Sequence, residues 1–301
     1  MQNSSSIIIA SAATVILLRD GATGPEVFLM RRHLNQSFMG GAYVFPGGRV
    51  DPGDDDPALE GVLFGSDGCG SVNPAQASFW GEVPSRTIHV AAIRETFEEA
   101  GVIFGRDETG ELVIPGSKVL KERLEILRGQ LNAGAVTLCE IASQLAVRFD
   151  PGMLVPYARW ITPEIEKKRF DTRFFLAVLP EGLEPVHDNR ELTDSRWITP
   201  GDALGKHGCG ELLLMPPTLK TIEEIGDFSS ISELLDFARA RMIYPILPQA
   251  FVRGDCFGVL LPHDPEYTIT DYRQPARPGE ISRIVMRNGI WATSAAPEFL
   301  F

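Results

Sequence analysis

Three glutamates in one short segment have the residue types and the spacing of a metal site. In an α-helix each residue turns by about 100°, so Glu95, Glu98 and Glu99 would share one sector of about 100°. Phe97 and Ala100 would lie on the opposite side and pack into a core. Carboxylates crowded on one face repel each other, and a hard divalent cation with oxygen ligands would offset that repulsion. The pattern therefore predicts a Mg²⁺ or Mn²⁺ site, with a solvated acidic face as the alternative.

A second motif precedes this helix, and the two together resemble a known signature. Gly48 and Asp54 lie in the run PGGRVDPGD, and Arg94 opens the run RETFEEAGV. These segments resemble the signature of the Nudix hydrolases, G-x5-E-x7-R-E-U-x-E-E-x-G-U, in which U is apolar. Asp54 stands where that signature has Glu, and Thr96 stands where it has an apolar residue. Residues 55–93 separate Asp54 from Arg94 where the signature has seven residues, so 32 residues are inserted.

The resemblance implies a role for each residue that matches the signature. Glu98 and Glu99 would bind the metal, with the carbonyl of Gly48 as a further ligand. Glu95 would be a ligand or would help to activate water. The bound cation would lower the pKa of that water. Arg94 would orient these carboxylates rather than contact the substrate.

Two further acidic residues are weaker candidates near the expected site. Asp54 is expected to support the ligands or to act as an extra ligand. Glu191 lies ahead of Trp197, at a position resembling an acidic position common in these folds, and is a candidate extra ligand or base.

The substrate expectation depends on the segment before the first motif. Arg32, Gly41 and Phe45 fit a pattern found in Nudix enzymes that hydrolyse coenzyme A, whereas Ser37 stands where that pattern has a second Arg. The resemblance implies cleavage of coenzyme A or acyl-CoA to 3′,5′-ADP and (acyl-)4′-phosphopantetheine. Arg32, Arg49 and Phe45 are the predicted substrate-binding residues, because arginines bind phosphates through charge-assisted hydrogen bonds.

Two other functions stay open at this point. One is a dinucleotide or nucleotide-sugar diphosphatase, which would use the same carboxylates on another substrate. The other is a Nudix-fold ligand sensor that binds without turnover.

Composition restricts the class of partner. The chain has 301 residues, with 28 Lys and Arg against 40 Asp and Glu, and a formal net charge of −12. Such an acidic protein is not expected to coat a nucleic-acid polymer, although a bound cation would still allow a small nucleoside diphosphate derivative. No stretch approaches the roughly 20 apolar residues of a membrane span. Four separated cysteines without a C-x-x-C pair favour a reducing cytoplasm. A homodimer is left open.

The order of the predicted elements indicates a Nudix-type α/β/α sandwich with a mixed sheet. Residues 1–215 are expected to form the Nudix domain, interrupted by an insertion at about 55–86, and 216–301 a helical and β extension. The insertion is expected to be either a lid or wall for the pantetheine arm, or a solvent loop. The charged residues of 169–175 are expected to form an Arg–Asp surface pair at a strand edge or to reach the cleft. The predicted helices are 87–100, 118–132, 138–149, 219–225 and 230–241, and the predicted strands are 7–19, 26–31, 157–161, 172–178, 195–198, 256–261 and 281–286.

Overall fold

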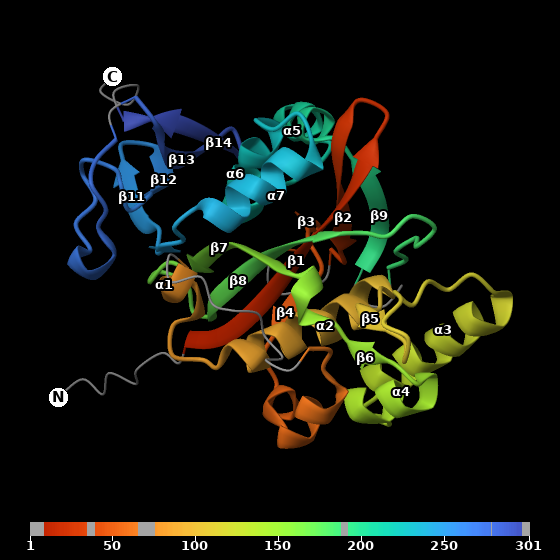
Figure 1. The fold of residues 1–301 in the computed structure, drawn as a ribbon. Helices are drawn as coiled ribbons and strands as arrows, with labels where there is room; N and C mark the ends of the chain where they lie inside the picture. Colours follow the sequence, from red (N-terminus) through yellow and green to blue (C-terminus); the bar gives the residue numbers. More distant parts are fainter. Residues whose placement is uncertain (1–8, 35–39, 66–75, 188–191, 278, 297–301) are drawn as a thin grey trace.

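A computed structural model of the chain describes residues 9–34, 40–65, 76–187, 192–277 and 279–296 (Figure 1). Ser37 and Glu191, both considered above, lie outside these residues. Among the described helices, none has the length and apolar character needed to cross a membrane.

The main sheet is organised around β1 (Ile9–Gly21), whose buried side chains alternate between its two faces. Ala13, Val15 and Leu17 enter the core on one face, and Ile16 and Leu18 enter the core on the other. β1 pairs in parallel with β8 (Arg169–Val178) and forms an antiparallel hairpin with β2 (Gly24–Arg32). The predicted mixed sheet and opening hairpin are therefore confirmed.

Eight strands form this sheet. Six of them run in the order β10-β7-β8-β1-β2-β3, while β4 pairs with β1 and β9 pairs with β2. The remaining strands are β3 (Tyr43–Val44), β4 (Gly47–Arg49), β7 (Val155–Ile161), β9 (Leu192–Ile198) and β10 (Pro245–Ile246). A separate two-stranded sheet pairs β5 (Gly105–Arg106) with β6 (Arg148–Phe149).

Helices cover both faces of the sheet, which gives the predicted α/β/α sandwich (Figure 1). One face carries α2 (Ser85–Ala100), α3 (Lys118–Asn132) and α4 (Leu138–Leu145). The other carries α5 (Pro200–Gly208), α6 (Pro216–Gly226) and α7 (Ile231–Ala240).

Two helix ends test the sequence prediction. α2 ends at Gly101 as predicted, because Gly101 adopts φ 67° and its N–H donates to the carbonyl of Phe97 at 3.0 Å. The helix predicted over 138–149 is too long. It ends at Leu145 because Ala146 turns into the left-handed region at φ 53°, and the following residues form β6.

The last part of the chain forms a four-stranded antiparallel sheet next to α6 and α7 (Figure 1). Val259 and Trp291 of this sheet join the same core as Leu219 of α6 and Ile16 of β1. Residues on both sides of position 215 thus complete one core, and the predicted division of the chain into domains stays a prediction. The strands are β11 (Gln249–Arg253), β12 (Cys256–Leu260), β13 (Ile281–Arg287) and β14 (Ile290–Ala295).

The described part of the insertion is packed against the domain. Leu59, Leu63, Phe79 and Trp80 are all buried in the core on the α2 face. The prediction of a solvent loop is therefore wrong for these residues, because apolar side chains of this size are more stable packed in the core than exposed to water. The 3₁₀ helix η1 (Pro52–Asp55) leads into the insertion, which contains the 3₁₀ helix η2 (Pro57–Val62) and the helix α1 (Ala77–Trp80). Two more 3₁₀ helices, η4 (Pro151–Met153) and η5 (Thr270–Tyr272), lie elsewhere.

Arg173 of β8 attaches α1 to the sheet. Its side chain is 1% exposed and donates hydrogen bonds to the carbonyls of Phe79 at 3.3 Å and Trp80 at 2.7 Å. Arg159 pairs with Asp171 through two hydrogen bonds of 2.8 and 2.7 Å. Within the predicted segment, Arg173 pairs with Asp171 at 3.1 Å, but Arg173 is buried, so the expectation of a surface pair is wrong and Arg173 serves as a structural link.

We expect Arg173→Met to lower the free energy of unfolding by about 3 kcal/mol, because two buried carbonyls and Asp171 lose a charged donor. The exposed neighbour Lys167 provides a control, and Lys167→Met should change this free energy by less than about 0.5 kcal/mol. Urea denaturation of both variants measures the difference. Equal stability of the two variants would show that Arg173 does not hold α1.

Candidate active site

Helix α2 places its three glutamates on one side, as the sequence predicts. Glu95, Glu98 and Glu99 all line a cavity, while Phe97 and Ala100 are buried in the core behind them. The side chains of Glu95 and Glu98 are only 12% and 17% exposed. Their charges are thus held in a setting with little water, where they interact strongly.

Arg94 connects these carboxylates to the first motif. Its Nε and Nη2 donate to the two carboxylate oxygens of Asp54 at 2.8 and 2.9 Å. Its Nη1 donates to Glu95 Oε1 and Glu98 Oε2, both at 2.9 Å. Because the Asp54 side chain is 2% exposed and faces Arg94, its contacts are those of a support for Arg94. Arg94 makes the contacts expected of a residue that orients carboxylates.

Gly47 and Gly48 of β4 allow this strand to approach α2 closely. A Cβ on Gly48 would lie 2.5 Å from the carboxylate carbon of Glu95, so a side chain there would displace that glutamate. Gly47 has φ 155°, and its N–H donates to Glu99 Oε2 at 2.8 Å. Arg94 Nη2 also donates to the carbonyl of Arg49 at 2.8 Å, which fixes β4 to the helix.

Burial alters the acid–base behaviour of the site. It raises the pKa of Glu95 to about 7, although Arg94 acts in the opposite direction. Burial also raises the pKa of Glu98. Strongly perturbed carboxylates in a cavity are typical of functional sites, because low polarity and neighbouring charges both disfavour the ionised form.

The donor set fits a hard divalent cation in its chemistry, although the described side chains do not converge as a ready-made cluster. No group of three or more His, Cys, Asp and Glu side chains within the described ranges is arranged to hold a metal ion. Arg94 bridges Glu95 and Glu98 through Glu95 Oε1 and Glu98 Oε2, the one carboxylate oxygen of each that it contacts. Carboxylate oxygens beside a backbone carbonyl are the ligands that Mg²⁺ and Mn²⁺ prefer.

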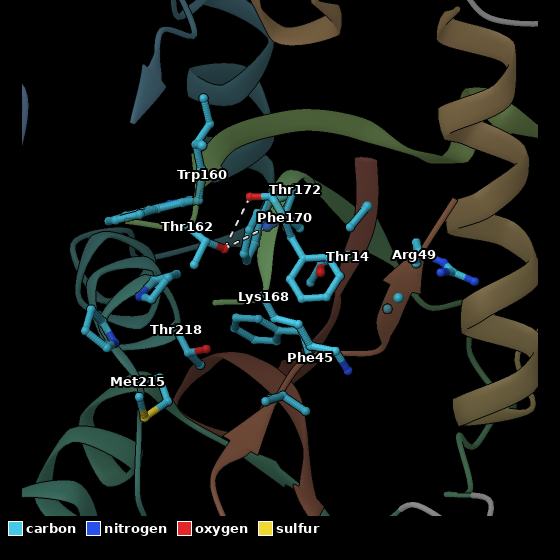
Figure 2. Close-up of a pocket in the computed structure, with 18 of the residues that line it drawn as sticks. Thr14, Phe45, Arg49, Trp160, Thr162, Lys168, Phe170, Thr172, Met215 and Thr218 are labelled. Atoms are coloured by element: carbon cyan, nitrogen blue, oxygen red, sulfur yellow. Dashed lines mark hydrogen bonds between the residues drawn. The ribbon is translucent and has the colours of Figure 1, made fainter. Parts of the chain in front are cut away.

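The cavity has a volume of about 550 Å³ and contains all three predicted substrate-binding residues. Arg32, Arg49 and Phe45 line it together with the three glutamates. Figure 2 shows Arg49 near the helix and Trp160 and Met215 on the far side. A cavity of this size is within the range of small-molecule sites.

Most of the remaining lining residues were not predicted from the sequence. Lys168, Glu166 and Asn132 add polar groups, and no described residue of the insertion at 55–86 lines the cavity. The proposed lid or wall therefore has no support among the insertion residues that the structure describes. The far side is instead apolar, and no local pattern indicated it because its residues come from distant segments: Trp160, Ile161, Phe170, Phe174, Met215, Pro216, Pro217, Pro248, Phe257, Val259 and Trp291.

Comparison with known proteins agrees with this geometry. The family model described as the NUDT19 Nudix domain matches residues 1–225. The acyl-coenzyme A diphosphatase NUDT19 of Homo sapiens is 27% identical over 274 residues, which cover 82% of this chain and 73% of that protein. The protein of the same name from Xenopus laevis is 26% identical over 280 residues, with 81% and 73% covered. A crystal structure of a Nudix hydrolase from Alicyclobacillus acidocaldarius has TM-score 0.65 and 28% identity, covering 77% of this chain and 97% of that one.

We expect Mg²⁺ or Mn²⁺ to bind about tenfold more weakly at pH 6 than at pH 8, because the cation competes with the proton that Glu95 holds below its pKa of about 7. In the metal-free protein the folded state binds this proton more tightly than the unfolded state does. Stability should therefore fall as pH rises from 4.5 to 7.

Calorimetric titration with each metal at the two pH values measures this effect. Glu95→Gln is the matched control, since it should bind metal more weakly and lose most of the pH dependence. Equal affinity of the native protein at pH 6 and pH 8 would contradict the prediction.

Proposed function

The chain belongs to the Nudix hydrolase family, and we propose that it hydrolyses the diphosphate of coenzyme A or an acyl-CoA. The observation that carries this proposal is the set of three α2 glutamates that line one cavity, with Glu95 and Glu98 held by Arg94 and Glu99 by the N–H of Gly47. Relatives named acyl-coenzyme A diphosphatase support the choice of substrate. The products would be 3′,5′-ADP and (acyl-)4′-phosphopantetheine.

The carboxylates would hold the divalent cation that Nudix hydrolases generally need. Glu98 and Glu99 are the proposed ligands, with the carbonyl of Gly48 beside them, and Glu95 is a ligand or helps to activate the attacking water. A bound Mg²⁺ or Mn²⁺ neutralises the diphosphate and lowers the pKa of water. Positioning and charge stabilisation supply most of the catalysis in phosphoryl transfer, so little covalent chemistry is required of the chain.

The other polar residues would bind and position the substrate. Arg32 and Arg49 line the same cavity as the carboxylates and would bind phosphate oxygens by charge-assisted hydrogen bonds. Phe45 is buried between the glycine-rich turn and the cavity and would contact the bound molecule. Arg94 and Asp54 would keep the carboxylates in register without touching the substrate.

A small nucleoside diphosphate derivative is thus the proposed partner, and a nucleic-acid polymer is not. The dinucleotide or nucleotide-sugar diphosphatase stays the alternative within the same chemistry. A Nudix-fold ligand sensor is less well supported, because this chain keeps all three glutamates. The reducing cytoplasm and a homodimer stay predictions; Cys139, Cys209 and Cys256 are free thiols, which is compatible with the former.

Glu98→Gln should lower kcat by about 1,000-fold, because the variant keeps the shape of the side chain but loses a charge placed at the reacting centre. Its thermal unfolding should stay close to that of the native protein. Glu122→Gln on the exposed side of α3 is the matched control and should keep full activity. Unchanged turnover by Glu98→Gln would contradict the proposed role of this carboxylate.

A substrate screen tests the choice of coenzyme A. The purified protein would be assayed with Mg²⁺ and Mn²⁺ against coenzyme A, acyl-CoAs, NADH, ADP-ribose and dinucleoside polyphosphates, with products identified by mass. We expect the highest kcat/KM with coenzyme A or its acyl derivatives. A preference for NADH, ADP-ribose or a dinucleoside polyphosphate would favour the alternative diphosphatase, and binding without any product would favour the sensor.

A further inference from the structure

The end of the cavity far from α2 is a chamber of apolar side chains. Figure 2 shows Trp160, Phe170 and Met215 on this side, across the cavity from Arg49. We call this region the apolar end. It consists of Trp160, Phe170, Met215, Pro216, Pro217, Pro248, Phe257, Val259 and Trp291.

Three of the nine residues of the apolar end, Phe257, Val259 and Trp291, belong to the C-terminal sheet, which lies outside residues 1–225 that match the family model. Phe257 and Val259 are two positions apart on β12, so their side chains lie on the same face of the sheet, and both line the cavity. Phe251 pairs with Gly258 and lies on the opposite face of the same sheet. The residues after 225 thus supply one wall of a cavity whose charged end belongs to the Nudix motif.

This wall is held firmly against the domain. The Nε2 atom of His207, at the end of α5, is 2.8 Å from the carbonyl oxygen of Trp291. The rings of Phe257 and Trp291 pack with centroids 5.8 Å apart. Because Trp291 is also buried in the core, the wall is preformed and does not have to be ordered by a ligand.

The hydrogen-bonding side chains at or beside the apolar end are few: the hydroxyls of Thr162, Thr172 and Thr218 and the indole N–H groups of Trp160 and Trp291. Pro216, Pro217 and Pro248 have no N–H to donate. The hydroxyl of Thr162 already accepts from the N–H of Phe170 at 3.0 Å. A purine buried there would leave polar edge atoms unsatisfied, which is costly, whereas an alkyl chain needs no polar partner.

Cationic side chains line the cavity, and Figure 2 shows Arg49 at the helix and Lys168 between Phe45 and the apolar end. Arg32, Arg49 and Lys168 all line it, with Lys168 exposed to solvent, although Glu166 and Asp51 line it as well. The phosphates of a nucleotide would be attracted to these cations and to the site on α2. The acyl-pantetheine arm of an acyl-CoA carries no charge, so the apolar end is the part of the cavity that suits it.

We propose that the apolar end receives the acyl-pantetheine arm of an acyl-CoA, and that Phe257 and the C-terminal sheet set the preference for chain length. The inference rests on the proposed function and extends it to the substrate's acyl group. The nucleoside then lies towards the cations, and the diphosphate between them lies at the carboxylates.

The test compares coenzyme A, acetyl-CoA, octanoyl-CoA and NADH with the native protein, Phe257→Ala and Phe251→Ala. In the native protein kcat/KM should rise with chain length, because each methylene fully buried adds up to about fourfold in binding. Phe257→Ala should lower the octanoyl-CoA to coenzyme A ratio of kcat/KM about tenfold, through lost contacts with the chain. Phe251→Ala, on the other face of the sheet, should leave this ratio unchanged, and thermal unfolding of each variant verifies folding.

Two outcomes would overturn the inference. If Phe257→Ala lowers kcat/KM equally for NADH, coenzyme A and octanoyl-CoA, the apolar end binds the nucleoside. If Phe257→Ala changes none of them, the apolar end does not contact the substrate.

A binding measurement separates this inference from the proposed function. Calorimetry with S-octanoyl-4′-phosphopantetheine and 4′-phosphopantetheine should show tighter binding of the acylated compound, and Phe257→Ala should remove the difference. If this holds while coenzyme A and acyl-CoAs are not hydrolysed, only the proposed function fails. If coenzyme A and acyl-CoAs are hydrolysed but acyl-chain length affects neither the rate of hydrolysis nor the binding of the phosphopantetheines, only the inference fails.

Discussion

The ion pair between Arg94 and Asp54 is the interaction on which the rest of the site depends. Two hydrogen bonds join the partners, which are 40 positions apart in the chain and nearly excluded from solvent. Removal of either partner would leave a buried charge uncompensated, which is far more costly than loss of a surface pair. Through the same guanidinium, Glu95 and Glu98 are held side by side. The pair therefore determines where the carboxylates stand relative to the glycine-rich turn.

This dependence explains how the signature tolerates a long insertion between its halves. The insertion leaves directly after Asp54 and returns at the start of α2, and contacts near both ends hold it close to the helix. Thr87 donates its hydroxyl to Asp55 at 2.6 Å, and Arg86, in the first turn of α2, donates to the carbonyls of Asp55 and Asp56, both at 3.1 Å. Because these links bring the two ends together in space, the number of residues between them matters little to the geometry of the site.

The two ends of the cavity differ in chemistry and in origin. The charged end is built from the turn at Gly47 and Gly48 and from α2, which are close in space through the pairing of β4 with β1. The apolar end combines β7 and β8 with the beginning of α6 and with the C-terminal sheet. A diphosphate flanked by dissimilar groups matches this division. The charged end would act on the bond common to all such substrates, and the apolar end would distinguish among them.

Local patterns in the sequence determined the elements and the chemistry of α2. Helical periodicity was enough to place Glu95, Glu98 and Glu99 on one side, and Gly101 was enough to end the helix, because both features depend on neighbouring residues alone. Only the tertiary structure decided that Asp54 serves Arg94, that the described insertion packs into the core, and that Phe257 and Trp291 reach the cavity. These contacts join distant segments, and their free energy depends on burial and matching of charge. No periodicity within a single segment records them.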